Sequence, residues 1–325
     1  MANAAHEASS SPAARAARGR ASLDPTHVAL GVLILLVLVN AWSTPNFATT
    51  SNLWNVLLQV STVVLVAIGM TPVVATGGID LSVGSVMAVG GAIGAILIPH
   101  GAVVAVAAAL AGACAIGLLN GLLVARMAVQ PIVVTLATLI GGRGLAQVLS
   151  HDGQLVTIQH PGFELLGRGH VGPFPAPVVI MVLVAAVAMF ILRATAFGRY
   201  VLASGGNPVA ARLAGVPVAL TVLTVYAGSA VLAGLAGLIE AARLGASDAA
   251  KIGMNMELDA IAATVVGGTA LTGGRATIVG TVIGALIMQV IATSLNMLLV
   301  PYAWSLALKA AIILLAVYFQ RPRLV

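Results

Sequence analysis

The residues best suited to chemistry lie in one short stretch, Thr76–Met87, which reads TGGIDLSVGSVM. It places a carboxylate, Asp80, and two serine hydroxyls within an otherwise apolar run, residues 56–98. A bilayer tolerates charged side chains and irregular backbone only where protein or a water-filled path surrounds them. We therefore expect this stretch to lie inside the protein, beside whatever crosses the membrane. Its expected path residues are Gly77, Gly78, Asp80 and Ser82.

The Asp80 carboxylate has two interpretations. It can contact a polar solute, or it can accept backbone N–H bonds at the start of the next helix, which is a common role of Asp. Neutral amide side chains near apolar segments suit a path for a polar solute, because they can replace hydrogen bonds to water without holding an ion. The same amides also hold helices together in a bilayer. These further candidates are Asn120, Gln147, Gln289 and Asn296.

Part of the stretch occurs a second time near the end of the chain. Thr272–Gly274 repeats Thr76–Gly78, and Val279–Val282 (VGTV) repeats Val83–Val86 (VGSV), both at an offset of 272 − 76 = 196 residues. Repeated elements of this kind are typical of transporters built from two related halves.

The composition excludes a soluble protein. Hydrophobic residues make up 60% of the chain and charged residues 7%, and the mean hydropathy is +1.09, whereas soluble domains carry about 25% charged residues. At about 20 residues per span, the length allows about ten spans. It leaves no room for a nucleotide-binding domain, and no phosphate-loop motif is present. The basic residues are scattered singly, which argues against nucleic-acid binding.

Ten apolar segments fit this count, so we expect an all-α membrane protein with about ten transmembrane helices and two related halves. Residues 1–26 are expected to form a disordered cytoplasmic tail, and residues 27–325 the transmembrane domain. The expected spans are Val28–Trp42, Leu53–Ala75, Val83–Ile98, Val103–Ala125, Pro131–Leu149, Pro177–Leu192, Val218–Ala242, Asp259–Leu271, Ile278–Leu299 and Tyr302–Phe319. Glycines at helical spacing predict close helix packing. They are Gly90, Gly91, Gly94, Gly228, Gly234 and Gly237.

The basic residues set the expected orientation. With the N-terminus inside, ten arginines fall in inner segments, and only Arg168, Arg243 and Lys251 fall in outer ones. This positive-inside bias, with an even number of spans, places both termini in the cytoplasm. The polar loops 150–176 and 243–258 are then outside.

The inner connector, Arg193–Pro217, carries a capped short helix. Gly205-Gly206 breaks the chain, Asn207 is a typical N-cap followed by proline, and Gly215 ends a helix over Pro208–Leu213. Such a helix at the cytoplasmic face is suited to docking another protein. The alternative is an ordinary loop between two spans.

Three motifs together resemble the permease family of bacterial ABC sugar importers, the ribose, xylose, arabinose and galactose branch. They are TGGIDLSVG, the inner connector, and the ELDAI…VVGGT…GGR stretch over Glu257–Arg275. The similarity runs from about residue 50 to the C-terminus. The GRGLAQ and GQLVT segments within Gly142–Thr157, and Ala246–Ala249 (ASDA), further resemble permeases for furanose sugars such as galactofuranose.

This resemblance implies a multi-pass protein of the bacterial inner membrane that imports a monosaccharide, a pentose or furanose-form sugar. It implies a periplasmic or extracellular sugar-binding protein, a second permease subunit (a sister chain or a copy of itself) and a cytoplasmic ABC ATPase. The ATPase would hold ATP and Mg²⁺, so the permease would bind no cofactor and would not be an enzyme. The residues that would couple to the ATPase are Gly205, Gly206, Asn207, Pro208, Ala211, Arg212 and Gly215.

Other functions stay open from the residues alone. One is a secondary transporter or channel for a small neutral solute, which would hold ion-coupling carboxylates at membrane depth. Another is an ABC permease for a sugar-like signalling molecule. Three outer histidines have spacings that fit no tight metal site. They are His151, His160 and His170.

Overall fold

The computed structural model describes residues 25–320, so nearly all of the expected N-terminal tail lies outside the described residues. The described chain is almost entirely helical, which confirms the all-α class. The long helices are α2 (Pro25–Ser43), α3 (Thr50–Ala75), α4 (Val83–Leu97), α5 (Ala102–Ala125), α6 (Pro131–Leu149), α8 (Ala176–Ala194), α11 (Val218–Leu244), α13 (Ile278–Met297) and α14 (Tyr302–Gln320). The shorter elements are η1 (Ile98–His100), β1 (Val156–Thr157), α7 (Pro161–Arg168), β2 (His170–Val171), β3 (Phe174–Pro175), α9 (Ala196–Gly206), α10 (Pro208–Leu213), β4 (Ala246–Ser247) and α12 (Met256–Val266).

Each of the ten expected spans contains a helix, but one is short. Among the described residues, 8 helices are long and apolar enough to cross a membrane: α2, α3, α4, α5, α6, α8, α11 and α13. The other two expected spans are α14, in which Ala303–Ile312 is a shorter apolar helix, and α12. Helix α12 has 11 residues and is roughly 16 Å long, whereas the hydrocarbon core is about 30 Å thick. The sequence predicted a short span here, Asp259–Leu271, but its bounds were wrong, because the helix begins three residues earlier and ends five residues earlier. The helix ends at Val266 because Gly267 and the left-handed Gly268 (φ 93°) turn the chain.

The core forms around α11, which packs against α3, α4 and α5. Glycines let these helices approach closely, because a Cβ on Gly90 would lie 3.0 Å from the Cα of Gly234. A Cβ on Gly237 would overlap the backbone of Met87. The predicted glycine packing is confirmed at these positions. Gly228 differs, since a Cβ there would have no atom within 4 Å.

The two halves carry corresponding helices. Adding 196 to the residue numbers of a helix in the first half gives the matching helix in the second half. Helix α2 (Pro25–Ser43) matches residues 221–239 within α11, and α4 (Val83–Leu97) matches residues 279–293 within α13. Helix α5 (Ala102–Ala125) matches residues 298–321, which include α14. The repeated turns share a conformation, with φ of 81° at Gly77 and 82° at Gly273. They also meet, since the Gly274 N–H donates to the Ala75 carbonyl over 2.8 Å. The helices that correspond across the predicted repeat thus follow one another in the same order in the two halves.

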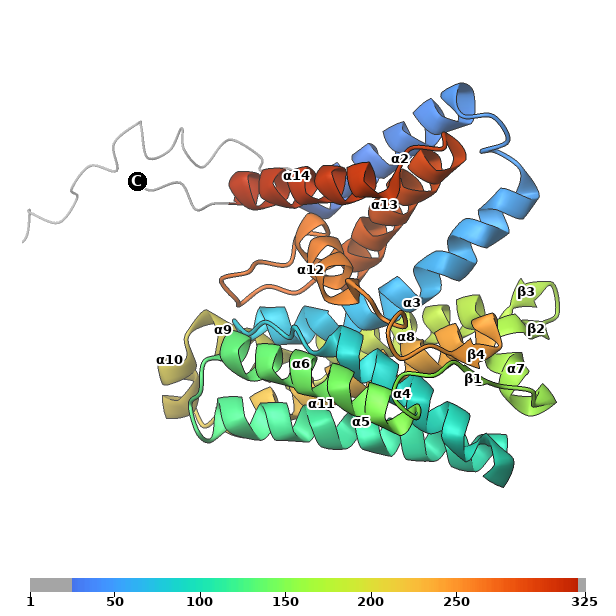
Figure 1. Cartoon of the computed structure of the whole chain (residues 1–325). Helices are drawn as coiled ribbons and strands as arrows, with labels where there is room; N and C mark the ends of the chain where they lie inside the picture. The colour runs from blue at the N-terminus through green and yellow to red at the C-terminus, as the bar shows by residue number, and fades with distance from the viewer. Residues whose placement is uncertain (1–24, 321–325) are drawn as a thin grey trace, which may run out of the picture.

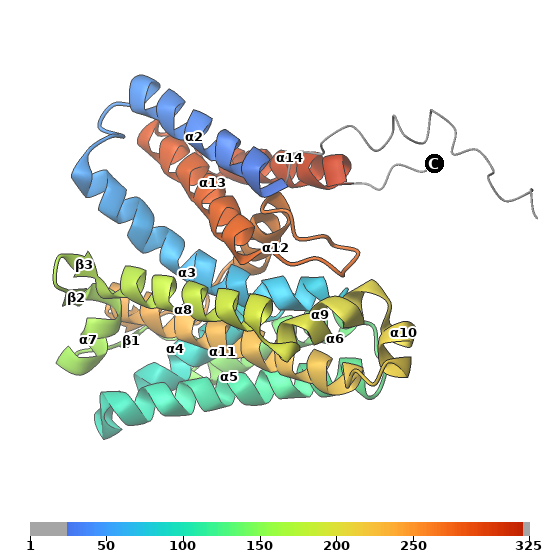
Figure 2. The ribbon, with the colours of Figure 1, turned by 180° about the vertical axis from the view of Figure 1, so that it is seen from behind.

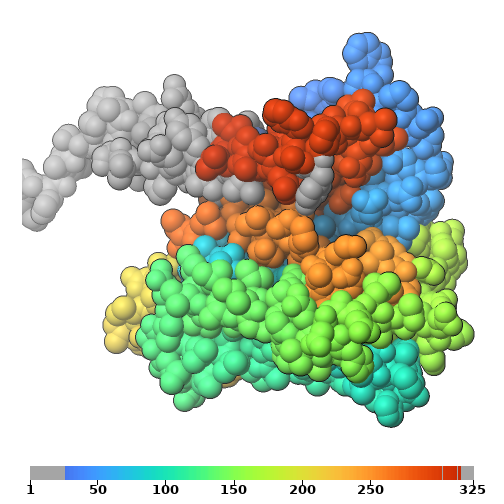
Figure 3. Space-filling model, viewed as in Figure 1, coloured from blue at the N-terminus to red at the C-terminus, as the bar shows by residue number. Residues whose placement is uncertain are grey.

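The expected inner and outer segments lie at opposite ends of the helix bundle. The two outer loops pair with each other through β1 and β4, in the register Val156↔Ser247. Helix α7 and the β2–β3 hairpin share that end, whereas α10 lies at the other (Figures 1 and 2). The space-filling view shows α2, α3, α13 and α14 gathered on one side and α5 and α6 on the other, with the orange residues around α12 between them (Figure 3).

Candidate translocation and coupling sites

Asp80 lies at the centre of a buried hydrogen-bond network before α4. Its Oδ1 accepts bonds from the Ser82 backbone N–H (3.0 Å) and the Ser82 Oγ–H (2.6 Å). Its Oδ2 accepts from the Ser229 Oγ–H on α11 (3.1 Å). Asp80 is 1% exposed. Both carboxylate oxygens are therefore satisfied by protein, and they tie the start of α4 to α11.

The network continues into two more helices. Asn120 on α5 donates from Nδ2 to the Ser82 Oγ (2.9 Å), and Thr138 on α6 donates to the Asn120 Oδ1 (2.6 Å). Three of the predicted path residues, Asp80, Ser82 and Asn120, thus form one buried cluster. Ser229 and Thr138 complete it. We did not predict them, because a hydroxyl in an apolar helix carries no signal of its partner in the sequence.

The other predicted path residues lie elsewhere. On α13, Gln289 donates from Nε2 to the Gln59 Oε1 of α3 over 2.9 Å. Gln147 and Asn296 are exposed, each near the outer end of its helix, and neither forms a side-chain hydrogen bond to Gln289 or to the Asp80 cluster. Gly77 and Gly78 form the inner turn that precedes Asp80. The predicted set therefore occupies several places in the fold.

At the inner end, the connector meets both repeated turns. Gly205 packs so closely on the Ala75 carbonyl that a Cβ would overlap it. A Cβ on Gly273 would lie 2.8 Å from the Gly205 oxygen, and Gly274 bonds to Ala75 as described above. The end of α3, the end of α9 and the second repeated turn are thus in direct backbone contact. Each glycine pair was predicted from the sequence, but the contact between the two pairs was not.

Helix α10 confirms the predicted capped helix at the expected bounds. The Asn207 Oδ1 accepts from the backbone N–H groups of Val209 (3.1 Å) and Ala210 (3.0 Å), and Gly215 is left-handed after the helix (φ 82°). Val209 is 64% exposed and Leu213 is 86% exposed. These two side chains lie four residues apart on one face. Of the other coupling candidates, Pro208 is the first helical residue, Ala211 is buried and Arg212 is exposed.

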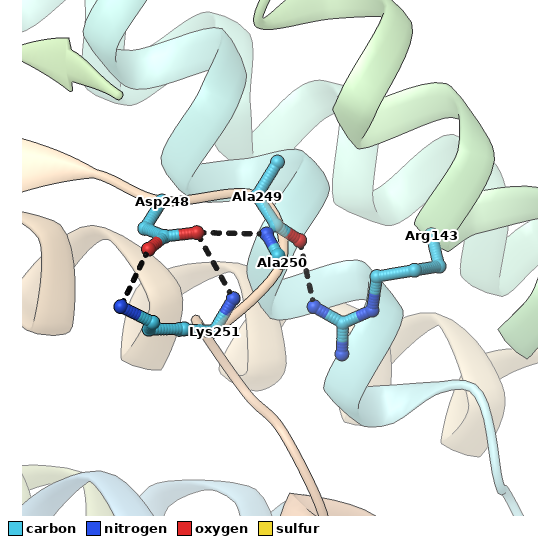
Figure 4. Close-up of polar contacts among 5 residues, drawn as sticks. All are labelled: Arg143, Asp248, Ala249, Ala250 and Lys251. Atoms are coloured by element: carbon cyan, nitrogen blue, oxygen red, sulfur yellow. Dashed lines mark hydrogen bonds and ion pairs between the residues drawn. The ribbon is translucent and has the colours of Figure 1, made fainter. Parts of the chain in front are cut away.

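An arginine from α6 holds the outer segment that precedes α12. Arg143 donates from Nη1 to the carbonyls of Ala249 (2.9 Å) and Ile252 (2.7 Å). Within that segment, the Asp248 Oδ1 accepts the N–H groups of Ala250 (3.0 Å) and Lys251 (3.2 Å). Figure 4 shows the Arg143 guanidinium group pointing toward this turn. The Arg143 side chain thus has a structural role, because it donates hydrogen bonds to backbone carbonyls of an irregular segment.

The two carboxylates at the start of α12 differ in their surroundings. Asp259 accepts from the Lys309 Nζ of α14 at both oxygens, over 2.7 and 2.9 Å. The Oε2 of Glu257 is buried without a hydrogen-bond partner among the described residues and lies close to Gly84. Residues 25–320 contain no group of three or more His, Cys, Asp or Glu side chains arranged to hold a metal ion.

Comparison with known proteins gives matches over almost the whole chain. Residues 52–317 match the family described as the permease component of the branched-chain amino acid transport system. The chain is 43% identical to the ribose import permease protein of Escherichia coli K12, with 90% of this chain and 92% of that protein covered. It is 38% identical to the galactofuranose transporter permease protein of the same strain, with 91% and 89% covered.

A third relative is the L-arabinose ABC transporter permease protein of Azospirillum brasilense. It is 38% identical to this chain, with 90% of this chain and 87% of the relative covered. No solved structure gives a significant match.

Proposed function

The chain belongs to the family of permease components of the branched-chain amino acid transport system, and from that premise we propose that it imports a monosaccharide of the pentose or furanose type. It is the multi-pass membrane subunit of an ABC importer, and ATP hydrolysis belongs to a separate subunit. The observation that carries the proposal is the full-length identity of 43% to a ribose import permease, with 38% to galactofuranose and arabinose permeases.

Helix α10 is the proposed contact with the cytoplasmic ATPase. Its support is the capped geometry together with two large apolar side chains, Val209 and Leu213, which are exposed on one face. Apolar side chains of this size at a water-facing end favour a protein partner. The backbone junction of Gly205 with Ala75 and Gly273 then provides a rigid route from α10 to both repeated halves. ATP and Mg²⁺ would be held by the ATPase.

Within the membrane we assign two roles to the polar side chains. The buried cluster of Asp80, Ser82 and Asn120 positions α4, α5 and α11, because its members bond to one another and are closed off from solvent. In the hydrogen-bonded pair of Gln289 and Gln59, Gln59 is exposed. The amides of this pair suit brief contact with sugar hydroxyls, as do the exposed amides of Gln147 and Asn296.

Two further partners complete the proposed importer. A second permease subunit, either a copy of this chain or a sister chain, would form the other half of the path. A periplasmic or extracellular sugar-binding protein would dock at the outer end. That end presents three exposed apolar side chains beside the β2–β3 hairpin, which favour a protein contact. They are Leu165, Val171 and Phe174.

Uptake of radiolabelled sugars tests the proposal in cells that carry or lack this chain. We expect accumulation of D-ribose, L-arabinose or D-galactofuranose that requires both this chain and the partner ATPase. A protonophore should leave uptake unchanged while ATP is maintained. Uptake that collapses with the proton gradient but survives loss of the ATPase would show a secondary transporter instead. Uptake of none of the three sugars would overturn the substrate class.

A further inference from the structure

An apolar groove lies between α8 and α11, whose ribbons can be followed in Figure 2. Its volume is about 580 Å³. Leu183 and Val187 of α8 line one wall, Gly228 and Leu232 of α11 line the other, and Cys114 of α5 also lines it. The absence of a side chain at Gly228 leaves the middle of the groove open.

The few hydroxyls in the groove are already bonded within the protein. The Thr224 Oγ–H donates to the backbone carbonyl of Leu220 (2.9 Å), and the Ser229 Oγ–H donates to Asp80 (3.1 Å). A sugar in the groove would lose its bonds to water and gain few in return. An acyl chain has no such loss and gains from burial of every CH₂ group. The lining therefore selects a hydrocarbon chain.

The inner end of the groove adjoins a pocket with two arginines. This pocket has a volume of about 260 Å³ and shares Leu192 and Ile278 with the groove wall. Arg193, at the end of α8, and Arg199, in α9, line it. Both arginines are exposed, and neither has an ion pair or a hydrogen-bonded side-chain partner among the described residues. Two unpaired guanidinium groups at the inner membrane surface match a phosphate group.

We propose that this groove and pocket together bind one anionic phospholipid of the inner leaflet. One acyl chain lies in the groove between α8 and α11, and the headgroup phosphate lies against Arg193 and Arg199. The lipid would contact α8, α11 and α9, and α9 belongs to the inner connector. It depends on neither the sugar nor the ATPase, so it stands independently of the proposed function.

The single cysteine provides a direct readout, because Cys114 is the only cysteine of the chain and lines the groove. The purified, delipidated permease in dodecyl maltoside is treated with N-ethylmaleimide while palmitoyl-oleoyl-phosphatidylglycerol is titrated in. We expect this lipid to slow alkylation at concentrations where the phosphatidylcholine of the same chains has little effect. Sodium phosphate alone should not slow it. Protection by phosphate alone would reduce the site to an anion pocket and overturn the lipid proposal.

Variants separate the headgroup contact from general lipid binding. The double variant Arg193→Gln/Arg199→Gln should need roughly 25-fold more phosphatidylglycerol for the same protection, about fivefold per arginine. Arg126→Gln removes an inner arginine that lines neither cavity and should match the wild type. Equal protection by the two lipids, or equal behaviour of the two variants, would contradict the headgroup assignment.

Filling the groove tests the chain assignment by a second readout. Native mass spectrometry counts the phosphatidylglycerol molecules retained by the folded protein. Gly228→Leu should lose the retained lipid, because its side chain enters the groove. Gly141→Leu adds the same bulk on α6, where a Cβ also has no atom within 4 Å, and should keep the lipid. Retention in Gly228→Leu would show that the chain lies elsewhere.

Discussion

At the scale of single residues, Asp80 illustrates how a membrane protein holds a carboxylate without a cation beside it. Three donors, from Ser82 and Ser229, satisfy its two oxygens. A buried group that is fully hydrogen-bonded specifies one arrangement of its neighbours. The carboxylate therefore acts first as a link among the unwound segment, α4 and α11.

This link predicts a loss of stability on truncation. Asp80→Ala leaves two buried hydroxyls and one N–H without their acceptor, which costs about 3 kcal/mol. We expect a clearly lower Tm in detergent, with Asp80→Asn between this variant and the wild type. Ser51→Ala, at an exposed position of α3, serves as a control and should unfold like the wild type. If Asp80→Ala kept its Tm and lost only sugar uptake, a direct contact with the solute would replace the structural role.

A second prediction at this scale compares two neighbouring glycines. Gly205→Ala places a methyl group on the Ala75 carbonyl, whereas the nearest atom to a Cβ on Gly206 is 4.0 Å away. The first change should separate the connector from α3 and lower both Tm and sugar uptake. The second should leave both unchanged. Thermal unfolding and uptake of the two variants, measured side by side, give the comparison; equal behaviour would show that the junction is loose.

The sequence allowed us to single out unusual residues in apolar segments, but not to predict what they contact. Asp80, Asn120 and the glycine pairs stood out because polar or flexible residues are rare in apolar segments. The partners of Asp80 and Asn120 did not stand out, because Ser229 and Thr138 come from other helices and are ordinary hydroxyl residues there. Without helix packing, no pattern in the sequence connects residue 80 to residue 229.

At the scale of elements, hydropathy predicted most helices, because a bilayer demands long apolar segments with internal backbone bonding. Helix α10 was predicted from its caps, since Asn207, the following proline and Gly215 act locally. The short span at Asp259–Leu271 was predicted to end five residues beyond the observed end of α12 at Val266. Apolar residues flank Gly267 and Gly268 there, so hydropathy continues past the point where the backbone turns.

Helix α10 carries the third prediction. Val209→Asp/Leu213→Asp places two charges on the exposed face and should abolish association with the ATPase, measured by co-purification. The helix itself should persist, because Asn207 and its cap bonds are unchanged. Met127→Asp changes another exposed apolar residue near the inner end of α5 and should keep the association. Retained association in the double variant would remove α10 as the ATPase contact.

The fourth prediction concerns the ion pair between α12 and α14. Lys309 and Asp259 have side chains that are 15% and 22% exposed, so removing one charge leaves the other poorly solvated. Lys309→Met should destabilise the fold by about 3 kcal/mol, seen as a lower Tm. Lys309→Met/Asp259→Asn, which has neither charge, should recover part of the loss. A double variant less stable than Lys309→Met would show that the pair is not what joins these helices.

At the scale of the whole molecule, two related halves meet at their repeated turns, and the inner connector joins both at that point. The repeat at an offset of 196 residues was predicted from the sequence, because the turns share residues. The contact between the two turns was not predicted, because it depends on how the halves pack. The arrangement places the exposed apolar face of α10 close in the chain to the junction at which Gly205 contacts both halves.

The measurement that tests this account most directly is purification of the tagged permease in mild detergent, with identification of every protein that accompanies it. The account predicts an ABC ATPase in the complex. A second, different permease would show a heterodimer, and this chain alone with the ATPase would show a homodimer. Absence of an ATPase, under conditions that keep a known ABC importer intact, would contradict the assignment of this chain as an ATP-driven permease.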